Sequence, residues 1–235
     1  PVIEVIKNHM GVSFAVAAIA TIFEFMIAIP LGITAATHQY SLRDYIVTVF
    51  VMIGISLPSF FFGNMLKNVL ALKLGWFPAS GLINASASYT GFALLLDYAR
   101  HAFIPILTIV ILSIGARMRM TRTNMLEVMN SDYIRTARAK GLKEKVVINK
   151  HAFRNTLIPV VTTLAGLLPS LFSGAIITEQ VFDLPGIGNK AYQAMIAADI
   201  PFIMGYNMFL ALLSVIGVLL ADLMYAVVDP RVKLA

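Results

Sequence analysis

Residues 130–156 read NSDYIRTARAKGLKEKVVINKHAFRNT, a polar and strongly basic segment in a chain that is otherwise apolar. Two acidic residues are set against seven basic ones, Arg135, Arg138, Lys140, Lys143, Lys145, Lys150 and Arg154. Apolar segments long enough to cross a bilayer lie on both sides. Because Lys and Arg next to membrane spans are retained on the cytoplasmic side, we expect this segment to be the main cytoplasmic face of an integral membrane protein.

The composition supports a membrane location and excludes other classes. Of the 235 residues, 59% are hydrophobic and 13% are charged, whereas a soluble domain carries roughly 25% charged residues. The formal charge of +6 comes mostly from the basic segment. Its basic residues flank apolar spans without interleaved aromatic residues, so we expect no nucleic-acid partner. The absence of cysteine excludes disulfides, thiolate metal sites and cysteine nucleophiles.

Long apolar runs predict an all-α fold with about five transmembrane helices, over residues 10–36, 45–72, 102–128, 157–181 and 200–224. Residues 1–9 form an outer segment in this scheme, and residues 230–235 form a cytoplasmic tail. Ten of the eighteen Lys and Arg residues lie between Arg117 and Arg154. This charge placement predicts an outer amino terminus and a cytoplasmic carboxyl terminus.

Two loops are expected on the outer side because they contain few Lys and Arg residues. Residues 75–101 include Trp76, which suits a membrane interface, and predict a short interfacial helix over about 92–99. Residues 182–199 begin with a turn and continue as a short helix over about 189–198.

Glu24 lies at mid-depth of the first span, and its carboxyl group should face the protein interior, since lipid-facing charge costs about 3 kcal/mol. A structural hydrogen bond between helices and a place on the transport pathway both remain open for it. Pro30 and Gly32 permit a kink near the far end of this span. Pro58 lies inside the second span, where neighbouring serines can satisfy the carbonyl that it frees.

The fourth span is the most interrupted, with Pro159, Gly166, Pro169 and Gly174. Small residues allow close helix packing, and prolines allow kinks. A gate helix that bends during transport is the functional alternative.

No sequence pattern for catalysis is present. The chain contains no G-x-x-x-x-G-K-[ST] loop, no H-E-x-x-H and no G-x-S-x-G. The histidines, His9, His38, His101 and His151, are scattered over loops on opposite sides of the membrane, so we expect no metal site. The pair Gly186 and Gly188 lacks the preceding strand of a nucleotide fingerprint. If energy drives transport, another chain must supply it.

Within the basic segment, Tyr133, Ile134 and Ala137 fall at helical spacing, and Gly141 can end that helix in the left-handed conformation. A second short helix should follow over about 143–152. Such an elbow could enter a groove on another protein, with its basic residues at the rim. It could equally rest on anionic lipid headgroups. The residues alone leave both alternatives open.

The heptapeptide RTARAKG at residues 135–141, followed by Leu157, Ile158 and Pro159, resembles the EAA loop of ABC-transporter permeases. Arg135 and Thr136 stand where that pattern has Glu and its first Ala, and the spacing to the Leu-Pro end is longer. These departures match the peptide and nickel branch, whose loops are similar to ARAKGL and HAFRN here, residues 137–142 and 151–155.

The resemblance covers nearly the whole chain. It includes IPLGI at residues 29–33, GWFPASG at 75–81, EQVFDLPGIG at 179–188 and DPR at 229–231. The nearest resemblance is to the B-type permeases of dipeptide and oligopeptide importers. It implies the six-helix fold of type I importers, with residues 10–229 as the transmembrane domain. Such permeases usually begin with one more span and an outer segment, so we expect the chain to be truncated.

The resemblance also implies a function and partners. The chain would be the non-catalytic permease subunit of an ATP-driven importer of di- or oligopeptides in a bacterial or archaeal inner membrane. Its partners would be a second permease, two ATPase subunits that hold ATP and Mg²⁺, an extracellular or periplasmic substrate-binding protein and membrane lipid. Nickel or glutathione import is an alternative. A secondary transporter driven by an ion gradient is the alternative from another class.

Site residues follow from the same resemblance. The residues expected to couple to the ATPase are Arg135, Ala137, Arg138, Ala139, Lys140, Gly141, Leu142 and Lys143. Glu24 and Glu179 are expected to have either a pathway role or a structural role.

Overall fold

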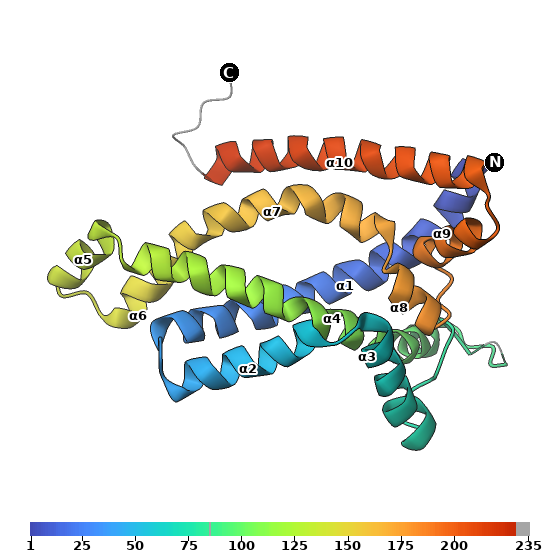
Figure 1. Ribbon diagram of the computed structural model, residues 1–235, viewed down its shortest axis with the longest axis horizontal. Coiled ribbons are helices and arrows are strands. Elements are labelled where there is room, and N and C mark those ends of the chain that lie inside the picture. Colours follow the sequence, from blue (N-terminus) through green and yellow to red (C-terminus); the bar gives the residue numbers. More distant parts are fainter. Residues whose placement is uncertain (85, 229–235) are drawn as a thin grey trace. The chain divides into compact units, whose positions relative to one another are not determined.

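The computed structural model describes residues 1–84 and 86–228 (Figure 1), and the side chains of residues 157–165 and 225–228 lie outside this description. The described chain is helical and contains no strand, which confirms the predicted all-α fold. In chain order the elements are α1 (Val2–Thr37), α2 (Leu42–Ser56), α3 (Ser59–Leu66), the π-helix η1 (Lys67–Lys73), α4 (Gly91–Met129), α5 (Asp132–Ala139), α6 (Glu144–Val146), the π-helix η2 (Val147–Ala152), α7 (Phe153–Ser173), α8 (Ile176–Val181), α9 (Ile187–Ile196) and α10 (Ile200–Val228).

Three described helices are long and apolar enough to cross a membrane: α1, α4 and the part of α10 from Ile200 to Met224. α2 followed by α3 and η1 passes the same test as a broken pair. The second span, expected over 45–72, is therefore not one continuous helix, because Leu57 and Pro58 interrupt it. Proline has no N–H to donate and disfavours the helical conformation in the residue before it. The span expected over 157–181 includes side chains outside the described ones.

α4 begins earlier than the expected third span. The separate interfacial helix predicted over about 92–99 is wrong, since these residues form the first turns of α4. Gly91, at φ +59°, marks the turn into the helix. Asp97 and His101 lie one turn apart and both are buried. Asp97 Oδ2 also accepts a hydrogen bond of 2.7 Å from the backbone N of Asn84, which attaches the preceding loop to α4.

The chain forms two compact units, and several long helices contribute to both. The first unit contains Pro1–Phe23, Ser56–Leu112 and Leu168–Leu213. The second unit contains Glu24–Ile55, Ser113–Leu167 and the segment that begins at Ser214.

Apolar side chains from distant segments form the core of the first unit. One cluster joins the start of α1 to α9 and α10, through Ile6, Ile187, Ala191, Ala194, Phe202 and Tyr206. A second cluster consists of Val16, Ile104, Phe182 and Leu184. Residues 1–9 were expected as an outer segment, but residues 2–9 form the first turns of α1, where Ile6 is 2% exposed. The tail at 230–235 and the DPR motif lie outside the described residues.

Glycines set two close helix contacts in the second unit. A Cβ added to Gly32 in α1 would lie 2.6 Å from Thr121 Cβ and 2.8 Å from Met118 O in α4. A Cβ added to Gly115 in α4 would meet the Ile55 side chain and would lie 3.1 Å from Val51 O in α2. Small residues allow helix backbones to approach in this way. Gly32 therefore has a packing role, which the sequence analysis did not assign to it.

Candidate functional site

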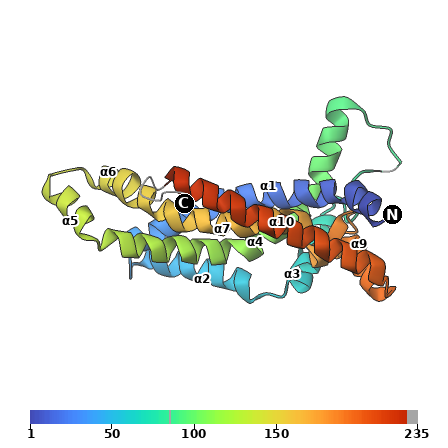
Figure 2. The ribbon, with the colours of Figure 1, turned by 90° about the horizontal axis from the view of Figure 1, so that it is seen from above.

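The basic segment forms two short helices joined at Gly141, as the sequence predicts. α5 ends at Ala139, and Gly141 follows at φ +75°, where its N–H donates to Arg138 O at 2.9 Å. A Cβ at Gly141 would meet nothing within 4 Å. The glycine is therefore required by the left-handed backbone conformation rather than by crowding. We call α5, the Gly141 turn and α6 with η2 the elbow; it lies beyond the end of α4 in two views (Figures 1 and 2).

The inner face of the elbow packs on the ends of two long helices. Ile134 and Val147 are fully buried and Ala137 is 7% exposed. They form one cluster with Ala36 of α1 and Met125 of α4. Ala137, predicted among the coupling residues, thus belongs to this internal core. A displacement of the elbow would be passed directly to α1 and α4, because packed interiors deform little.

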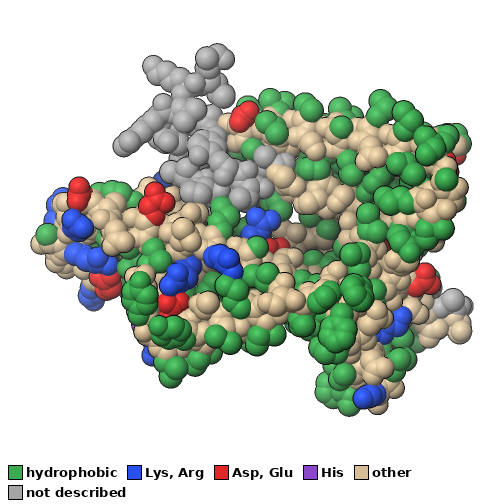
Figure 3. All heavy atoms as spheres, viewed as in Figure 1, with side chains coloured by type: hydrophobic (Ala, Val, Ile, Leu, Met, Phe, Trp, Pro, Cys, Tyr) green, Lys and Arg blue, Asp and Glu red, His purple; other side chains and the backbone are tan. Residues whose placement is uncertain are grey.

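The outer face of the elbow carries the other predicted coupling residues. All seven are exposed: Arg135, Arg138, Ala139, Lys140, Gly141, Leu142 and Lys143. Lys and Arg side chains gather over this end in the space-filling view (Figure 3). Exposed apolar side chains lie among them, with Tyr133 at 48%, Leu142 at 40% and Val146 at 37% exposure. Tyr133 and Val146 were not among the predicted coupling residues, although both lie in the segment singled out.

An ion pair bridges the Gly141 turn. Arg138 Nη2 donates to Glu144 Oε1 at 2.8 Å, and Arg138 Nε donates to Oε2 at 3.2 Å. The hydrogen bond from Arg138 lowers the pKa of Glu144 below its usual value, although burial opposes the shift. The guanidinium predicted to face a partner is thus already bound within the elbow. Sequence spacing does not predict this pair, because the contact between the two side chains depends on the turn at Gly141.

Glu24 forms an ion pair between α1 and α4 in the second unit. Arg117 Nε donates to Glu24 Oε1 at 2.9 Å, and Glu24 is 6% exposed. The Arg117 guanidinium also lies 5.2 Å from the centre of the Phe25 ring, a distance suited to a cation–π contact. This geometry favours the structural alternative for Glu24.

A second ion pair joins α2 to α4. Arg122 Nε donates to Asp44 Oδ1 at 3.0 Å, and Arg122 Nη2 donates to Oδ2 at 2.9 Å. Asp44 Oδ2 also accepts from the backbone N of Tyr40 at 3.1 Å. Neither Asp44 nor the two arginines of these ion pairs are singled out in the sequence analysis. Arg117 and Arg122 both hold α4 against a neighbouring helix.

A separate cluster in the first unit, the Glu179 cradle, surrounds a carboxylate that is 2% exposed. Ser13 Oγ donates to Glu179 Oε1 at 2.6 Å, and the backbone N of Asn189 donates to Oε2 at 2.9 Å. Asn189 lies in the first turn of α9, where backbone N–H groups have no partner within the helix. The carboxylate thus caps α9 and complements its dipole.

Glycines make room for this carboxylate. A Cβ at Gly174 would lie 2.5 Å from Glu179 Oε1, and one at Gly186 would lie 2.6 Å from Ser13 Oγ. A Cβ at Gly188 would lie 3.0 Å from Glu179 Oε2. The EQVFDLPGIG segment therefore encodes a buried acid together with the helix start that it caps. This geometry favours the structural alternative for Glu179. Within the described residues, no group of three or more His, Asp or Glu side chains could hold a metal ion.

The fold of this chain also occurs in a solved ABC transporter. The described chain superposes on a chain of the MetNI methionine ABC transporter, solved in inward-facing conformations, with a TM-score of 0.74. The superposition covers 97% of this chain and 98% of that one at 16% sequence identity.

Sequence comparison identifies the family. Residues 28–234 match the family described as binding-protein-dependent transport system inner membrane component. The chain is 39% identical to the oligopeptide transport system permease protein AppB of Bacillus subtilis, over 99% of this chain and 72% of that protein. It is 35% identical to the dipeptide transport system permease protein DppB of Alkalihalophilus pseudofirmus, over 99% and 74%. The chain therefore belongs to this family of multi-pass membrane permeases.

Proposed function

We propose that this chain forms, with a second homologous permease, the transmembrane pathway of an ATP-driven importer of di- or oligopeptides. The permeases AppB and DppB carry oligopeptide and dipeptide transport in their names. A putative peptide transport system permease protein of Brucella abortus is 36% identical over 99% of this chain. The proposal rests on the sequence identity of 35–39% to these peptide permeases over 99% of this chain.

The elbow is the proposed site of coupling to an ATPase subunit. Its exposed face presents Tyr133, Leu142 and Val146 among basic side chains, a combination suited to a groove with an acidic rim. Its buried face holds Ile134 against α1 and α4. Movement of the ATPase subunits would therefore displace the cytoplasmic ends of these helices. ATP and Mg²⁺ would be held by the two ATPase subunits, and this chain would take no part in the hydrolysis.

The proposed orientation places the elbow and the carboxyl terminus in the cytoplasm, and the amino terminus of this chain outside. The transmembrane domain would extend over residues 10–229. An extracellular or periplasmic binding protein would deliver the peptide to the loops at 75–101 and 182–199. The charge distribution supports this orientation, since the loop at 182–199 contains one basic residue, Lys190.

Uptake by the assembled transporter tests the proposal. The complex, purified with its ATPases and placed in vesicles with the binding protein, should accumulate a labelled peptide when ATP is supplied on the elbow side. Collapse of ion gradients with ionophores should leave uptake unchanged. Uptake that depends on an ion gradient and not on ATP would refute the importer. ATP-dependent uptake of a nickel chelate or glutathione, without peptide uptake, would refute the substrate class.

A further inference from the structure

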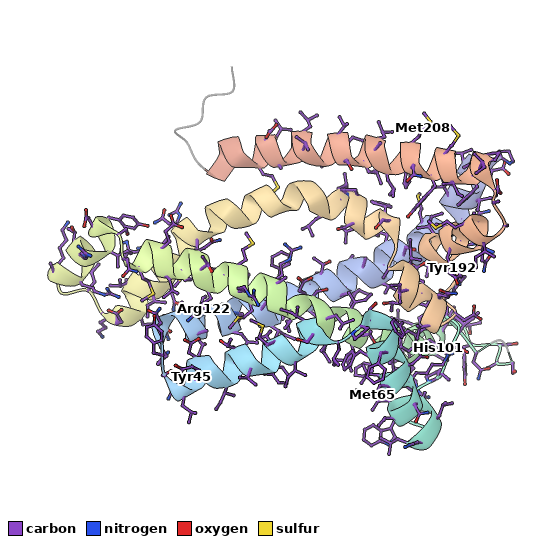
Figure 4. The ribbon with its side chains drawn as sticks, in the orientation of Figure 1. Tyr45, Met65, His101, Arg122, Tyr192 and Met208 are labelled. Atoms are coloured by element: carbon purple, nitrogen blue, oxygen red, sulfur yellow. The ribbon has the colours of Figure 1, made fainter. Side chains whose placement is uncertain are left out.

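A groove of about 400 Å³ lies in the second unit between α2 and α4. Its polar end is lined by Tyr40, Tyr45 and Arg122, and the Arg119 guanidinium lies beside Met52, where the polar residues meet the apolar ones. Tyr45 extends from α2 and Arg122 from α4 (Figure 4). Tyrosine and arginine side chains are typical of the membrane interface, where apolar and polar surroundings meet. The groove is separate from the elbow and from the Glu179 cradle.

The polar end carries an excess positive charge. Arg122 is matched by Asp44, with hydrogen bonds of 3.0 and 2.9 Å to its two oxygens. Arg119 is exposed, and its Nη2 lies 3.0 Å from Met52 Sδ, a neutral and weak acceptor. Two guanidinium groups and one carboxylate leave one net positive charge. The groove thus offers a cationic group that a single anion would complement.

The other end of the groove is apolar. Val51, Met52 and Ile55 of α2 line it together with Gly115 of α4. The Ile55 side chain packs against Gly115, so Met52 and Ile55 of α2 form the apolar surface at this end. Met52 and Ile55 are 39% and 43% exposed, so an alkyl chain placed there would bury apolar surface. Burial of each CH₂ group contributes about 0.8 kcal/mol.

We propose that this groove binds one anionic phospholipid, with the phosphate at Arg119 and an acyl chain along Met52 and Ile55. The polar-to-apolar order along the groove matches the headgroup-to-chain order of a phospholipid. The net charge of +1 matches the single negative charge of phosphatidylglycerol. Basic pockets between transmembrane helices bind anionic headgroups in this manner. The proposal does not depend on which substrate the transporter carries.

Native mass spectrometry of the assembled transporter tests this site. The complex is delipidated and then supplied with phosphatidylglycerol, phosphatidylcholine or glycerol phosphate. We expect retention of phosphatidylglycerol in preference to phosphatidylcholine, and no retention of glycerol phosphate, since the chain contributes to binding. Arg119→Gln should weaken phosphatidylglycerol binding about fivefold, the loss expected for one arginine near a headgroup. Arg119→Lys should retain the preference, because it retains the charge.

Arg100→Gln is the matched control, because Arg100 is an exposed arginine in the same helix and does not line the groove. An equal loss in Arg119→Gln and Arg100→Gln would overturn the proposal, as would equal retention of the two lipids. Binding of glycerol phosphate alone would also overturn it. A photoreactive p-benzoylphenylalanine in place of Tyr45 should crosslink to lipid. Adducts with a protein subunit instead would show that a partner helix covers the groove.

Discussion

Ser13 and Glu179 are 166 residues apart in sequence, and their side chains form a buried hydrogen bond of 2.6 Å. The same hydroxyl oxygen accepts from the backbone N of Ile187 at 2.8 Å. One small side chain in α1 thus connects the buried carboxylate to the start of α9. Both interactions lie within the first unit, so this contact stabilises the segment 182–199 against α1.

Replacement of Ser13 by alanine should therefore destabilise the protein. It leaves Glu179 Oε1 and the Ile187 N–H without the serine partner in a buried site, at a cost of about 1–3 kcal/mol. We expect a lower midpoint of thermal unfolding for Ser13→Ala in detergent. Ser80→Ala is the control, because Ser80 is exposed. Equal midpoints for the two variants would contradict a stabilising role for the cradle.

Two glycines in α1 make a matched pair for a packing test. Gly32→Ala places a methyl group 2.6 Å from Thr121 Cβ, whereas Gly11→Ala places one in open space. We expect Gly32→Ala to destabilise the protein by about 1–3 kcal/mol through overpacking. Gly11→Ala should be neutral or should stabilise by about 0.5–1 kcal/mol, as glycine is the poorer helix former. Chemical unfolding in detergent measures both, and a loss of stability in both variants would argue against a specific contact at Gly32.

The ion pair across the elbow can be tested by exchanging its charges. Arg138→Glu or Glu144→Arg alone places like charges together and should lower the peptide uptake obtained per ATP hydrolysed. The double variant restores the pair, which is worth about 0.5 kcal/mol at an exposed site, and should recover part of the coupling. No recovery would mean that Arg138 acts through the ATPase surface rather than through Glu144.

This pair also predicts a pH dependence. The pKa of Glu144 lies below its ordinary value of 4.5 in the folded elbow. The ion pair is therefore fully present above that ordinary value and is lost as the pH falls through the lowered folded pKa. Amide hydrogen exchange at α5 and α6 should increase over this acidic range in the wild type. Glu144→Gln should remove that pH-dependent component.

Gly141 offers a direct test of the elbow as the coupling site. Gly141→Asp places a negative charge on the basic face, and aspartate tolerates the left-handed conformation better than most residues. We expect ATPase assembly to persist and peptide uptake per ATP hydrolysed to fall about tenfold, equivalent to roughly 1.4 kcal/mol. Gly91→Asp is the matched control, since Gly91 has φ +59° and equally open space. Normal coupling in Gly141→Asp would refute the assignment.

The features of the structure that could be predicted are those that depend on residues close together in the sequence. The basic segment, the Gly141 turn and the long apolar helices follow from local charge, glycine conformation and hydrophobic runs. The early start of α4 did not follow from local sequence, because tertiary packing decides where a helix begins. Pro58 is compatible with either a kinked or a broken helix, so local sequence did not decide between them. Contacts such as Ser13 with Glu179 depend on the folding of distant segments, and one sequence contains no direct sign of them.

Variants of the Glu24–Arg117 ion pair can distinguish a structural role of Glu24 from a role on the transport pathway. Glu24→Ala leaves Arg117 without its carboxylate partner at a site where breaking such a pair costs about 3–5 kcal/mol, so we expect poor stability and little assembled transporter. The double variant Glu24→Gln with Arg117→Gln removes both charges and should recover stability and peptide uptake together. If stability recovers while uptake stays lost, Glu24 contributes to the pathway itself. We expect stability and uptake to recover together. The 2.9 Å hydrogen bond from Arg117 Nε to Glu24 Oε1 joins α1 to α4, and this contact accounts for the buried carboxylate.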